Sequence, residues 1–512
     1  MISVARLRRA VRRDTFGVDV EAVLDLVGAL LKYLGLAFLV PAAVALGYGE
    51  SVWPFLLSGA ITSAAGAALE RLATGKERVS PREGFLIVAL TWLLVPAFGS
   101  LPYVFAGEAE LGRPINAYFE SVSGFTATGA TVLEDFDTLT RSLALWRQFT
   151  QWLGGMGIIV LAIAILPRLR VGGRQLLQSE LAGPTEVERL SVSIRDTARR
   201  LWVLYVALTA VLIALLALLG WTGVEERMNL FEAAAHAFTT VSIGGFSTQA
   251  RSLEAFGPAV QWTVALFIVL AGINFLRLYR LFVQRHGRAF ARDEELRLYL
   301  LLLTIGSAVL FVELVGSGRF AGEEAVRHAV FQAVSIMTTT GFASTDYVAW
   351  GPLAAVTIVG LMFFGASAGS TGGSIKVVRH LLISRLLRRE LDQTVHPEIV
   401  SPIRLNGAVV EERALRAVLA FVLLYVGFFA LGALALVVES FRTTTGVSPF
   451  EAIAAAAATL GNVGPAYGFA GPMGSYEPFS PLSKVIMIGL MWLGRVEIIP
   501  VVVLLTRAYW RS

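Results

Sequence analysis

Long apolar segments separated by short polar ones make up most of this chain. A helix needs about 20 predominantly apolar residues to cross a hydrocarbon core about 30 Å thick. The bilayer is therefore the expected solvent for most of the fold, and we predict an all-α polytopic membrane protein. We predict spanning helices at roughly 22–48, 52–70, 83–105, 142–166, 199–221, 257–284, 294–317, 352–383, 413–439 and 480–508.

Four further apolar segments are shorter, and each runs into a turn that contains glycine. A helix of this length cannot span the bilayer, but it can enter it and turn back where protein surrounds the turn. We therefore predict four re-entrant half-helices. They lie near 114–128, 229–243, 323–340 and 447–461.

These segments belong to a repeat of helix, half-helix, glycine turn and helix. Each half-helix carries a Phe-Glu or Phe-Gln pair, and the turns align on one glycine. The distance from the phenylalanine to that glycine is 10, 14, 10 and 14 residues. Because four residues are about one helical turn, we expect the half-helices to alternate in length. The aligned pairs and glycines are Phe119-Glu120 with Gly129, Phe231-Glu232 with Gly245, Phe331-Gln332 with Gly341, and Phe450-Glu451 with Gly464.

The glycine turns are suited to a cation. An ion in a narrow pore must replace its water with oxygen atoms, and backbone carbonyls supply them where glycine allows unusual backbone angles. Half-helices entering from outside direct their negative C-terminal ends at the centre. The turns contain no Lys or Arg, while Thr126 and Ser242 add hydroxyl groups. The predicted filter residues are Ala127, Thr128, Gly129, Ile243, Gly244, Gly245, Thr339, Thr340, Gly341, Asn462, Val463 and Gly464.

The distribution of charge gives the orientation. With the N-terminus in the cytoplasm, inside segments hold 31 Lys or Arg and outside segments hold nine, as the positive-inside rule requires. The net charge of +5 is thus explained without nucleic acid. Outside segments also hold 18 Asp or Glu. These either attract cations to the pore mouth or are ordinary solvated loop charges.

The composition excludes several activities. There is no cysteine, which excludes disulfides and thiolate metal sites. We find no phosphate-binding or dinucleotide-binding motif and no metal-ligand cluster, so any nucleotide control must come from another subunit. We expect no cofactor and no enzymatic activity. His236 is expected to be a packed polar residue. Asn274, Arg277 and Arg280 either mark a partner contact or, more simply, reach the interface by snorkelling.

Two segments are candidates for a gate. Residues 365–374 read GASAGSTGGS, a poor helix interior, so we predict an unwound intramembrane loop. Tight packing of small residues is the alternative interpretation. Lys376 follows the loop, and it could contact the loop or a carboxylate, or repel cations. The predicted gate residues of the loop are Gly365, Gly369, Ser370, Thr371, Gly372 and Gly373, and Lys376 is predicted to belong to the gate as well.

The last apolar segment contains a charge near its middle, Arg495. A buried charge in the membrane is costly unless it is paired or faces water. Arg495 is therefore either a gate residue below the filter or a structural ion-pair member. Glu497 is two residues away and does not share a helix face with it, so we expect the two side chains to have different partners.

With these residues, the chain resembles the TrkH/KtrB/HKT superfamily of potassium transporters over roughly residues 80–510. The turns SIGGFST, TTTGFAST and NVGP carry the resemblance, together with the loop at 365–374 and Arg495. Residues 22–70 resemble the additional first module of TrkH-type members. The resemblance implies selectivity for potassium because position 129 is glycine; serine there is associated with sodium.

The predicted organisation follows the repeat. Residues 1–21 form a cytoplasmic N-terminus, 22–80 an extra two-helix module, and 171–198 and 385–412 are cytoplasmic loops. The pore repeats are 81–170, 199–290, 291–384 and 413–512.

The resemblance implies potassium uptake in a prokaryotic inner membrane by a homodimer, with a cytosolic nucleotide-binding ring of the TrkA type that opens the loop. One alternative is a symporter that couples potassium to sodium or protons. An intramembrane enzyme is the other. It would need acidic pairs, a Ser/His couple or a metal cluster inside the spans, and the spans offer none.

Overall fold

The computed structural model describes residues 18–73, 81–164, 194–285, 287–399, 401–443 and 446–510. Most of the predicted cytoplasmic segments 1–21 and 171–198 lie outside these ranges. Within them the regular structure is helical, apart from a two-stranded antiparallel hairpin of β1 (Arg404–Leu405) and β2 (Ala408–Val409). The expected all-α architecture is confirmed.

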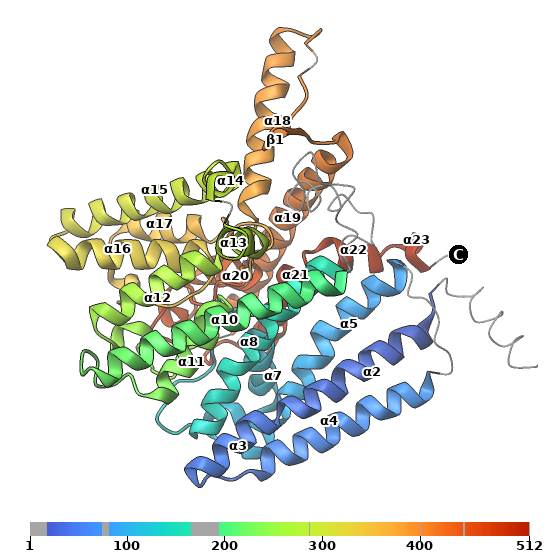
Figure 1. Cartoon of the computed structure of the whole chain (residues 1–512), viewed down its shortest axis with the longest axis vertical. Helices are drawn as coiled ribbons and strands as arrows, with labels where there is room; N and C mark the ends of the chain where they lie inside the picture. The colour runs from blue at the N-terminus through green and yellow to red at the C-terminus, as the bar shows by residue number, and fades with distance from the viewer. Residues whose placement is uncertain are drawn as a thin grey trace, which may run out of the picture.

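The N-terminal module is a pair of antiparallel helices on the outside of the bundle, next to α5 (Figure 1). Glycines let the two backbones approach closely, because a side chain at Gly28 would collide with the carbonyl of Gly66. Lys32 forms a 2.6 Å ion pair with Glu70 across the same contact. The module comprises α2 (Val20–Ala37), α3 (Leu39–Tyr48) and α4 (Trp53–Leu72).

The four repeats follow in chain order. The first comprises α5 (Pro81–Gly99), α6 (Leu101–Ala106), the half-helix α7 (Pro114–Phe125) and α8 (Arg141–Ala164). The second comprises α10 (Ile194–Trp221), the half-helix α11 (Leu230–Val241), α12 (Pro258–Ala271) and α13 (Phe275–Phe282). The third comprises α14 (Gly287–Ala291), α15 (Glu294–Gly316), the half-helix α16 (Gly322–Met337), α17 (Pro352–Leu361) and α18 (Val377–Val395). The fourth comprises α19 (Glu412–Arg442), the half-helix α20 (Pro449–Leu460), α21 (Pro481–Arg495), α22 (Ile499–Leu504) and α23 (Arg507–Trp510).

Within the described residues, five of the ten predicted spans are divided between successive helices, and in three of them the break is longer than one residue. The segment predicted as one helix at 257–284 bends by 104° between α12 and α13. The segment at 352–383 is non-helical from 362 to 376, a longer break than the predicted 365–374. The segment at 480–508 breaks after Arg495, where Glu497 and Ile498 both have positive φ. Among the described residues, five helices are long and apolar enough to span, or six with the bent pair.

The half-helices form the centre of the molecule, and their side chains are mostly buried. Different signals start them: a proline in the first turn of α7, an Asn229 cap on α11, and a capping box of Ser448 and Glu451 on α20. The alanine run of α20, at 452 and 454–458, is buried and permits close packing on every side.

The predicted alternation in half-helix length is wrong. The half-helices α7, α11 and α20 each have 12 residues, and α16 has 16. Phe231 and Phe450 simply lie one turn nearer the start of their helices than Phe119 does. Similar Phe-Glu pairs therefore lie in different helical turns of the half-helices in different repeats.

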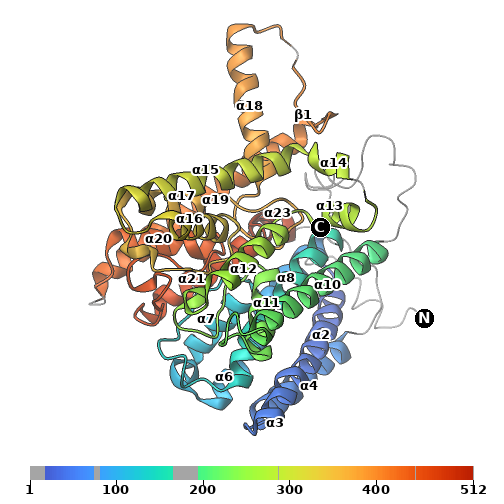
Figure 2. The ribbon, with the colours of Figure 1, turned by 60° about the vertical axis from the view of Figure 1, so that its left-hand side comes forward.

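Helix α18 projects away from the bundle, and the hairpin lies beside its base, as two views agree (Figures 1 and 2). It starts directly after the non-helical segment 362–376. Its last turns carry exposed apolar side chains at Leu387, Leu391 and Val395. The helix thus links the centre of the membrane part to the segment predicted as a cytoplasmic loop.

Candidate functional site

The four glycine turns share one backbone conformation. In each, the residue two before the glycine has φ between 50° and 70°, and the glycine itself has φ between 77° and 99°. Side chains other than glycine rarely adopt this left-handed region, so its recurrence in all four turns is a structural repeat. The first positions are Ala127, Ile243, Thr339 and Asn462, and the glycines are Gly129, Gly245, Gly341 and Gly464.

Each turn is closed by hydrogen bonds to its own half-helix. The amide of Thr128 donates to the carbonyl of Ser123 at 2.8 Å. The equivalent amides of Gly244, Thr340 and Val463 each donate at 2.8 Å to a carbonyl of their own half-helix. This is the pattern of a helix end capped by a left-handed residue. The half-helices therefore end at the turns, with the negative end of each helix dipole there.

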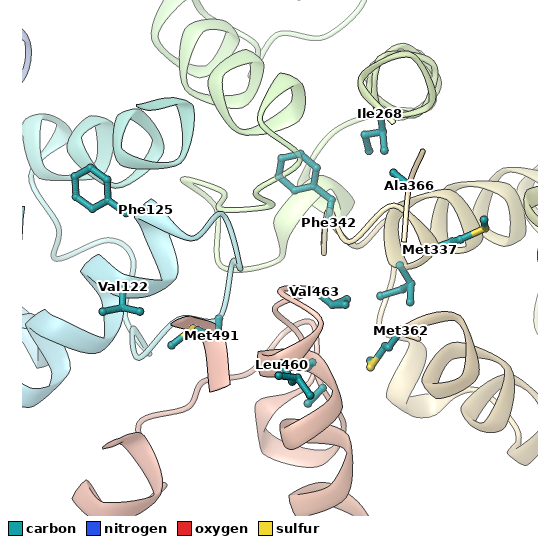
Figure 3. Close-up of a cluster of buried hydrophobic side chains, with 14 of the residues drawn as sticks. Val122, Phe125, Ile268, Met337, Phe342, Met362, Ala366, Leu460, Val463 and Met491 are labelled. Carbon is teal, nitrogen blue, oxygen red and sulfur yellow. The ribbon is translucent and has the colours of Figure 1, made fainter. Parts of the chain in front are cut away.

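The turns close into a ring. A side chain at Gly129 would collide with the carbonyl oxygen of Gly244. The same holds for Gly245 with Thr340, for Gly341 with Val463, and for Gly464 with Thr128, which returns to the first turn. Figure 3 shows segments of all four repeats converging on this centre, with Phe342 and Val463 among the labelled side chains. The structure thus brings all twelve predicted filter residues together in four consecutive turns.

A buried polar brace stands nine residues before the glycine in three of the repeats. Glu120 accepts from the amide of Val132 at 2.9 Å and pairs with Arg147 at 2.7 Å. His236 contacts the hydroxyl of Ser247 at 2.9 Å. The braces tie each half-helix to the chain that follows its turn. The third brace is Gln332, which donates to the carbonyl of Phe342 at 3.3 Å.

The pairs aligned from the sequence are not equivalent in the structure, because Glu232 was aligned with Glu120. Aligned on the glycine instead, His236 is the counterpart of Glu120, and Ala455 holds that place in the fourth repeat. The expectation that His236 is a packed polar residue is confirmed, since it is fully buried and hydrogen-bonded.

Two side chains that were not predicted from the sequence, Gln151 and Tyr476, contact the ring, and the predicted residue Asn462 joins two of its turns. Gln151 of α8 donates to the carbonyl of Gly244 at 2.6 Å and accepts from the amide of Phe246 at 3.0 Å. Tyr476 donates to the carbonyl of Gly464 at 2.6 Å. The amide group of Asn462 joins the fourth turn to the hydroxyl of Thr128 at 2.9 Å. Polar residues such as Gln151 inside an apolar segment were the available signal.

The non-helical segment 362–376, here called the intramembrane loop, contacts the C-terminal ends of three half-helices. The hydroxyl of Thr371 donates to the carbonyl of Val241 in α11 at 3.2 Å. The amide of Gly373 donates to the hydroxyl of Thr339 at 2.7 Å, and a side chain there would collide with the carbonyl of Gly461. The loop therefore lies directly against the ring. Of its predicted gate residues, Thr371, Gly372 and Gly373 face the half-helix ends. Gly365, Gly369 and Ser370 lie earlier in the loop.

Arg495 joins the intramembrane loop to the first repeat. Its guanidinium donates to the carbonyl of Thr371 at 2.9 Å and to the carbonyl of Gly154 at 3.1 Å. Among the described residues no carboxylate lies within ion-pair distance of it, and its Nε has no partner. The structural ion-pair interpretation is therefore not supported within that part of the chain. As predicted, Glu497 has a different partner, Arg379, at 2.5 Å.

Lys376 and Arg277 complete the surroundings of the loop. The ammonium group of Lys376 donates to the carbonyl of Gly372, so it contacts the loop rather than a carboxylate. Arg277 is buried between Asp293 and Glu295, so the snorkelling interpretation is wrong for this side chain. Asn274 caps α13 and lies against Gly369.

These features define a class of protein: a polytopic membrane chain in which re-entrant half-helices from four repeats meet at one ring of matching turns, as in pore-loop transport proteins. The chain belongs to the TrkH family. The model of that family, described as a cation transport protein, matches residues 54–511. The resemblance noted from the sequence is confirmed, and the chain is a transport protein rather than an enzyme.

Known relatives cover nearly the whole chain. The Trk system potassium uptake protein TrkH of Escherichia coli K12 is 36% identical over 96% of this chain and 99% of its own length. The protein of the same name from Halomonas elongata is 36% identical over 97% and 100%. The crystal structure of the potassium transporter TrkH from Vibrio parahaemolyticus matches with a TM-score of 0.85 at 33% identity, covering 96% and 100% of the two chains.

Proposed function

We propose that this protein conducts potassium into the cell through a pore whose filter is the ring of four turns. The observation that carries the proposal is the closure of that ring, in which each glycine lies against the carbonyl of the next turn. Four such carbonyls can replace the water around a cation, and four helix dipoles favour positive charge there. Relatives over the whole length are named potassium uptake proteins.

The choice of potassium is tied to Gly129. Its φ of 87° and its contact with the carbonyl of Gly244 leave no room for a side chain. A larger residue would move the Gly244 carbonyl and change the size of the ring. Discrimination between potassium and the smaller sodium ion depends on the arrangement of these oxygens.

The proposed gate is the intramembrane loop together with Arg495. The loop contacts three of the four half-helix ends, and Arg495 fixes Thr371 to the first repeat. A positive charge and a backbone segment at this place raise the barrier for a cation leaving the ring. Conduction requires both to move.

The setting of the protein is proposed from the same fold. The chain works as a homodimer in a prokaryotic inner membrane, with its N-terminus in the cytoplasm. A cytosolic nucleotide-binding ring of the TrkA type acts on the cytoplasmic segments. The projecting helix α18 supports this proposal, because it starts at the loop and reaches the segment where such a partner would bind.

Flux of rubidium, a potassium substitute, into proteoliposomes containing the purified chain tests the proposal. We expect uptake driven by an internal potassium load, and a reversal potential that follows the potassium gradient alone. A reversal potential that shifts with the sodium or proton gradient would favour the symporter. Absence of uptake, including from a variant shortened within residues 365–374, would contradict the pore.

A further inference from the structure

The two halves of the intramembrane loop are held by different parts of the molecule. Thr371 and Gly373 contact the half-helix ends, as described above. The preceding residues contact the C-terminal end of α12 and the start of α13 instead. The amide of Ser367 donates to the carbonyl of Gly272 at 3.0 Å, and the carbonyl of Gly369 accepts from the amide of Phe275 at 3.1 Å. The bend between α12 and α13 is therefore one anchor of the loop.

A carboxylate supplies the second anchor. Glu295, in the first turn of α15, accepts a hydrogen bond from the amide of Ala368 at 2.7 Å. Its side chain is 1% exposed. Its other oxygen lies 3.4 Å from the guanidinium of Arg277. A buried carboxyl group without a nearby cation is costly, so Arg277 is the group that compensates the burial of Glu295 beside the amide of Ala368.

Arg277 is shared with a second carboxylate, Asp293, which caps α15 by accepting from the amide of Leu296 at 2.8 Å. The two carboxylates and the guanidinium form one cluster, here called the α15 cluster: Arg277, Asp293 and Glu295. Moving Asp293 therefore changes the position or charge balance of Arg277, and through it the support of Glu295.

The tip of the β1–β2 hairpin contacts this cluster and the start of α15. Asn406 donates from its side-chain amide to Asp293 at 2.9 Å and accepts from the amide of Glu294 at 3.0 Å. Its own backbone amide donates to the Glu294 carboxylate at 2.9 Å. Its φ of 51° and the 84° of Gly407 are those of a tight Asn-Gly hairpin turn. One residue thus forms the turn and makes three contacts to the start of α15.

We propose that the hairpin is a latch: docked through Asn406, it stabilises the intramembrane loop in its present position by way of the α15 cluster. The route runs from Asn406 to Asp293, Arg277, Glu295 and the amide of Ala368. The hairpin lies between α18 and α19, in the segment 385–412, so a cytosolic partner that pulls on this segment would undock it. This inference rests on the proposed gate and specifies how that gate is controlled.

The decisive variant is Asn406→Gly. Glycine keeps the positive φ of the turn but removes the side-chain contacts, so the hairpin still forms while its latch is lost. We expect basal rubidium flux into proteoliposomes to rise about five-fold, the equivalent of about one net hydrogen bond. Val409→Ala is the matched control, because Val409 lies in the same hairpin, is 56% exposed, and makes no contact in the route. Its flux should equal that of the unmodified chain.

A second measurement follows the loop itself. Because the chain has no cysteine, Ala368→Cys provides a single labelling site next to the Glu295 contact. We expect a water-soluble thiol reagent to react with it faster when Asn406→Gly is present. Unchanged flux with Asn406→Gly would overturn the latch, as would unchanged labelling or an equal rise in flux with Val409→Ala.

The route is tested by combining Asn406→Gly with Glu295→Gln, which keeps the acceptor oxygen and removes the charge. If both act through the α15 cluster, the double variant should conduct little more than the stronger single variant. Multiplied effects would contradict the route. Shortening residues 365–374 separates the two proposals: if that change raises flux and Asn406→Gly does not, only the latch fails. If neither raises flux, the gate itself is wrong.

Discussion

The ring of turns and the intramembrane loop are both irregular backbone at membrane depth, and they are stabilised in opposite ways. Each turn is closed by hydrogen bonds to its own half-helix, only a few residues away, and the same bonds occur four times. The loop also has internal hydrogen bonds, among them those from the amide of Gly365 to the carbonyl of Ile375 and from the hydroxyl of Ser374 to the carbonyl of Met362, both at 2.8 Å. Its other contacts reach α11, α12, α13, α15, α16 and Arg495.

The difference has a physical consequence. A turn closed by its own helix cannot move unless the helix end unfolds, so the ring keeps its geometry while ions pass. A segment attached to many separate elements loses individual contacts whenever one element shifts, and such segments belong to the less stable parts of a fold. The ring therefore suits selection and the loop suits gating.

The largest expected effect comes from disturbing the ring with Gly245→Ala. A side chain here is strained by the φ of 77° and collides with the carbonyl of Thr340, at a cost of about 3 kcal/mol. We expect rubidium flux to be lost and the melting temperature in detergent to fall. Gly360→Ala is the control, because no atom lies within 4 Å of the added group. Normal flux through Gly245→Ala would show that the ring is not the conducting path.

Gly129→Ser should act on selectivity more than on flux. The added side chain must displace the carbonyl of Gly244, which Gln151 also fixes, so the ring changes size at one point. We expect the preference for potassium over sodium to fall about ten-fold, corresponding to about 1.4 kcal/mol. Bi-ionic reversal potentials measure this ratio. An unchanged ratio with reduced flux would indicate general damage and contradict the assignment of the filter.

Substitutions of Arg495 test whether the contacts of the intramembrane loop keep the pore closed. Arg495→Gln removes the charge and the fork that joins Thr371 to Gly154, so we expect basal flux to rise about five-fold. Arg495→Lys separates the two causes, because lysine keeps the charge but cannot bridge two carbonyls as arginine does. Flux as low as in the unmodified chain with lysine would assign the closure to charge. If neither variant raises flux, Arg495 is only structural.

Much of the ring could be predicted from the sequence, because its information is local. Four glycines at matching places in similar units indicate matching turns, and backbone rules define what glycine permits there. The braces were harder to predict. Glu120 and His236 have the same structural role but are different residue types, and only their distance from the glycine relates them. The pair Phe231-Glu232 looked equivalent to Phe119-Glu120 and lies one turn away.

The surroundings of the loop were less predictable, because they depend on contacts between distant segments. The small residues of 365–374 indicated a broken helix, yet the break extends from 362 to 376, since Ser374 and Lys376 bond to the loop itself. Nothing in the sequence pairs Arg277 with Asp293, or Asn406 with Glu294. The positive φ of Glu497 likewise follows from its position between α21 and α22, rather than from its residue type.

The smallest expected effect concerns the ion pair of Arg379 and Glu497, which joins α18 to the break in the last span. Both side chains are partly exposed, at 17% and 28%, so solvent screens the pair and we expect a coupling energy of only about 0.5 to 1 kcal/mol. A double-mutant cycle with Arg379→Gln and Glu497→Gln, followed by thermal unfolding in detergent, measures it. Arg379 also stacks on Phe421 at 3.8 Å, so Arg379→Gln alone should destabilise the protein more than Glu497→Gln alone. Because this contact lies beyond the intramembrane loop, the cycle should leave basal flux unchanged. A rise in flux comparable to that of Arg495→Gln would show that the break in the last span is part of the gate. The protein would then have a third segment that moves, in addition to the ring and the intramembrane loop.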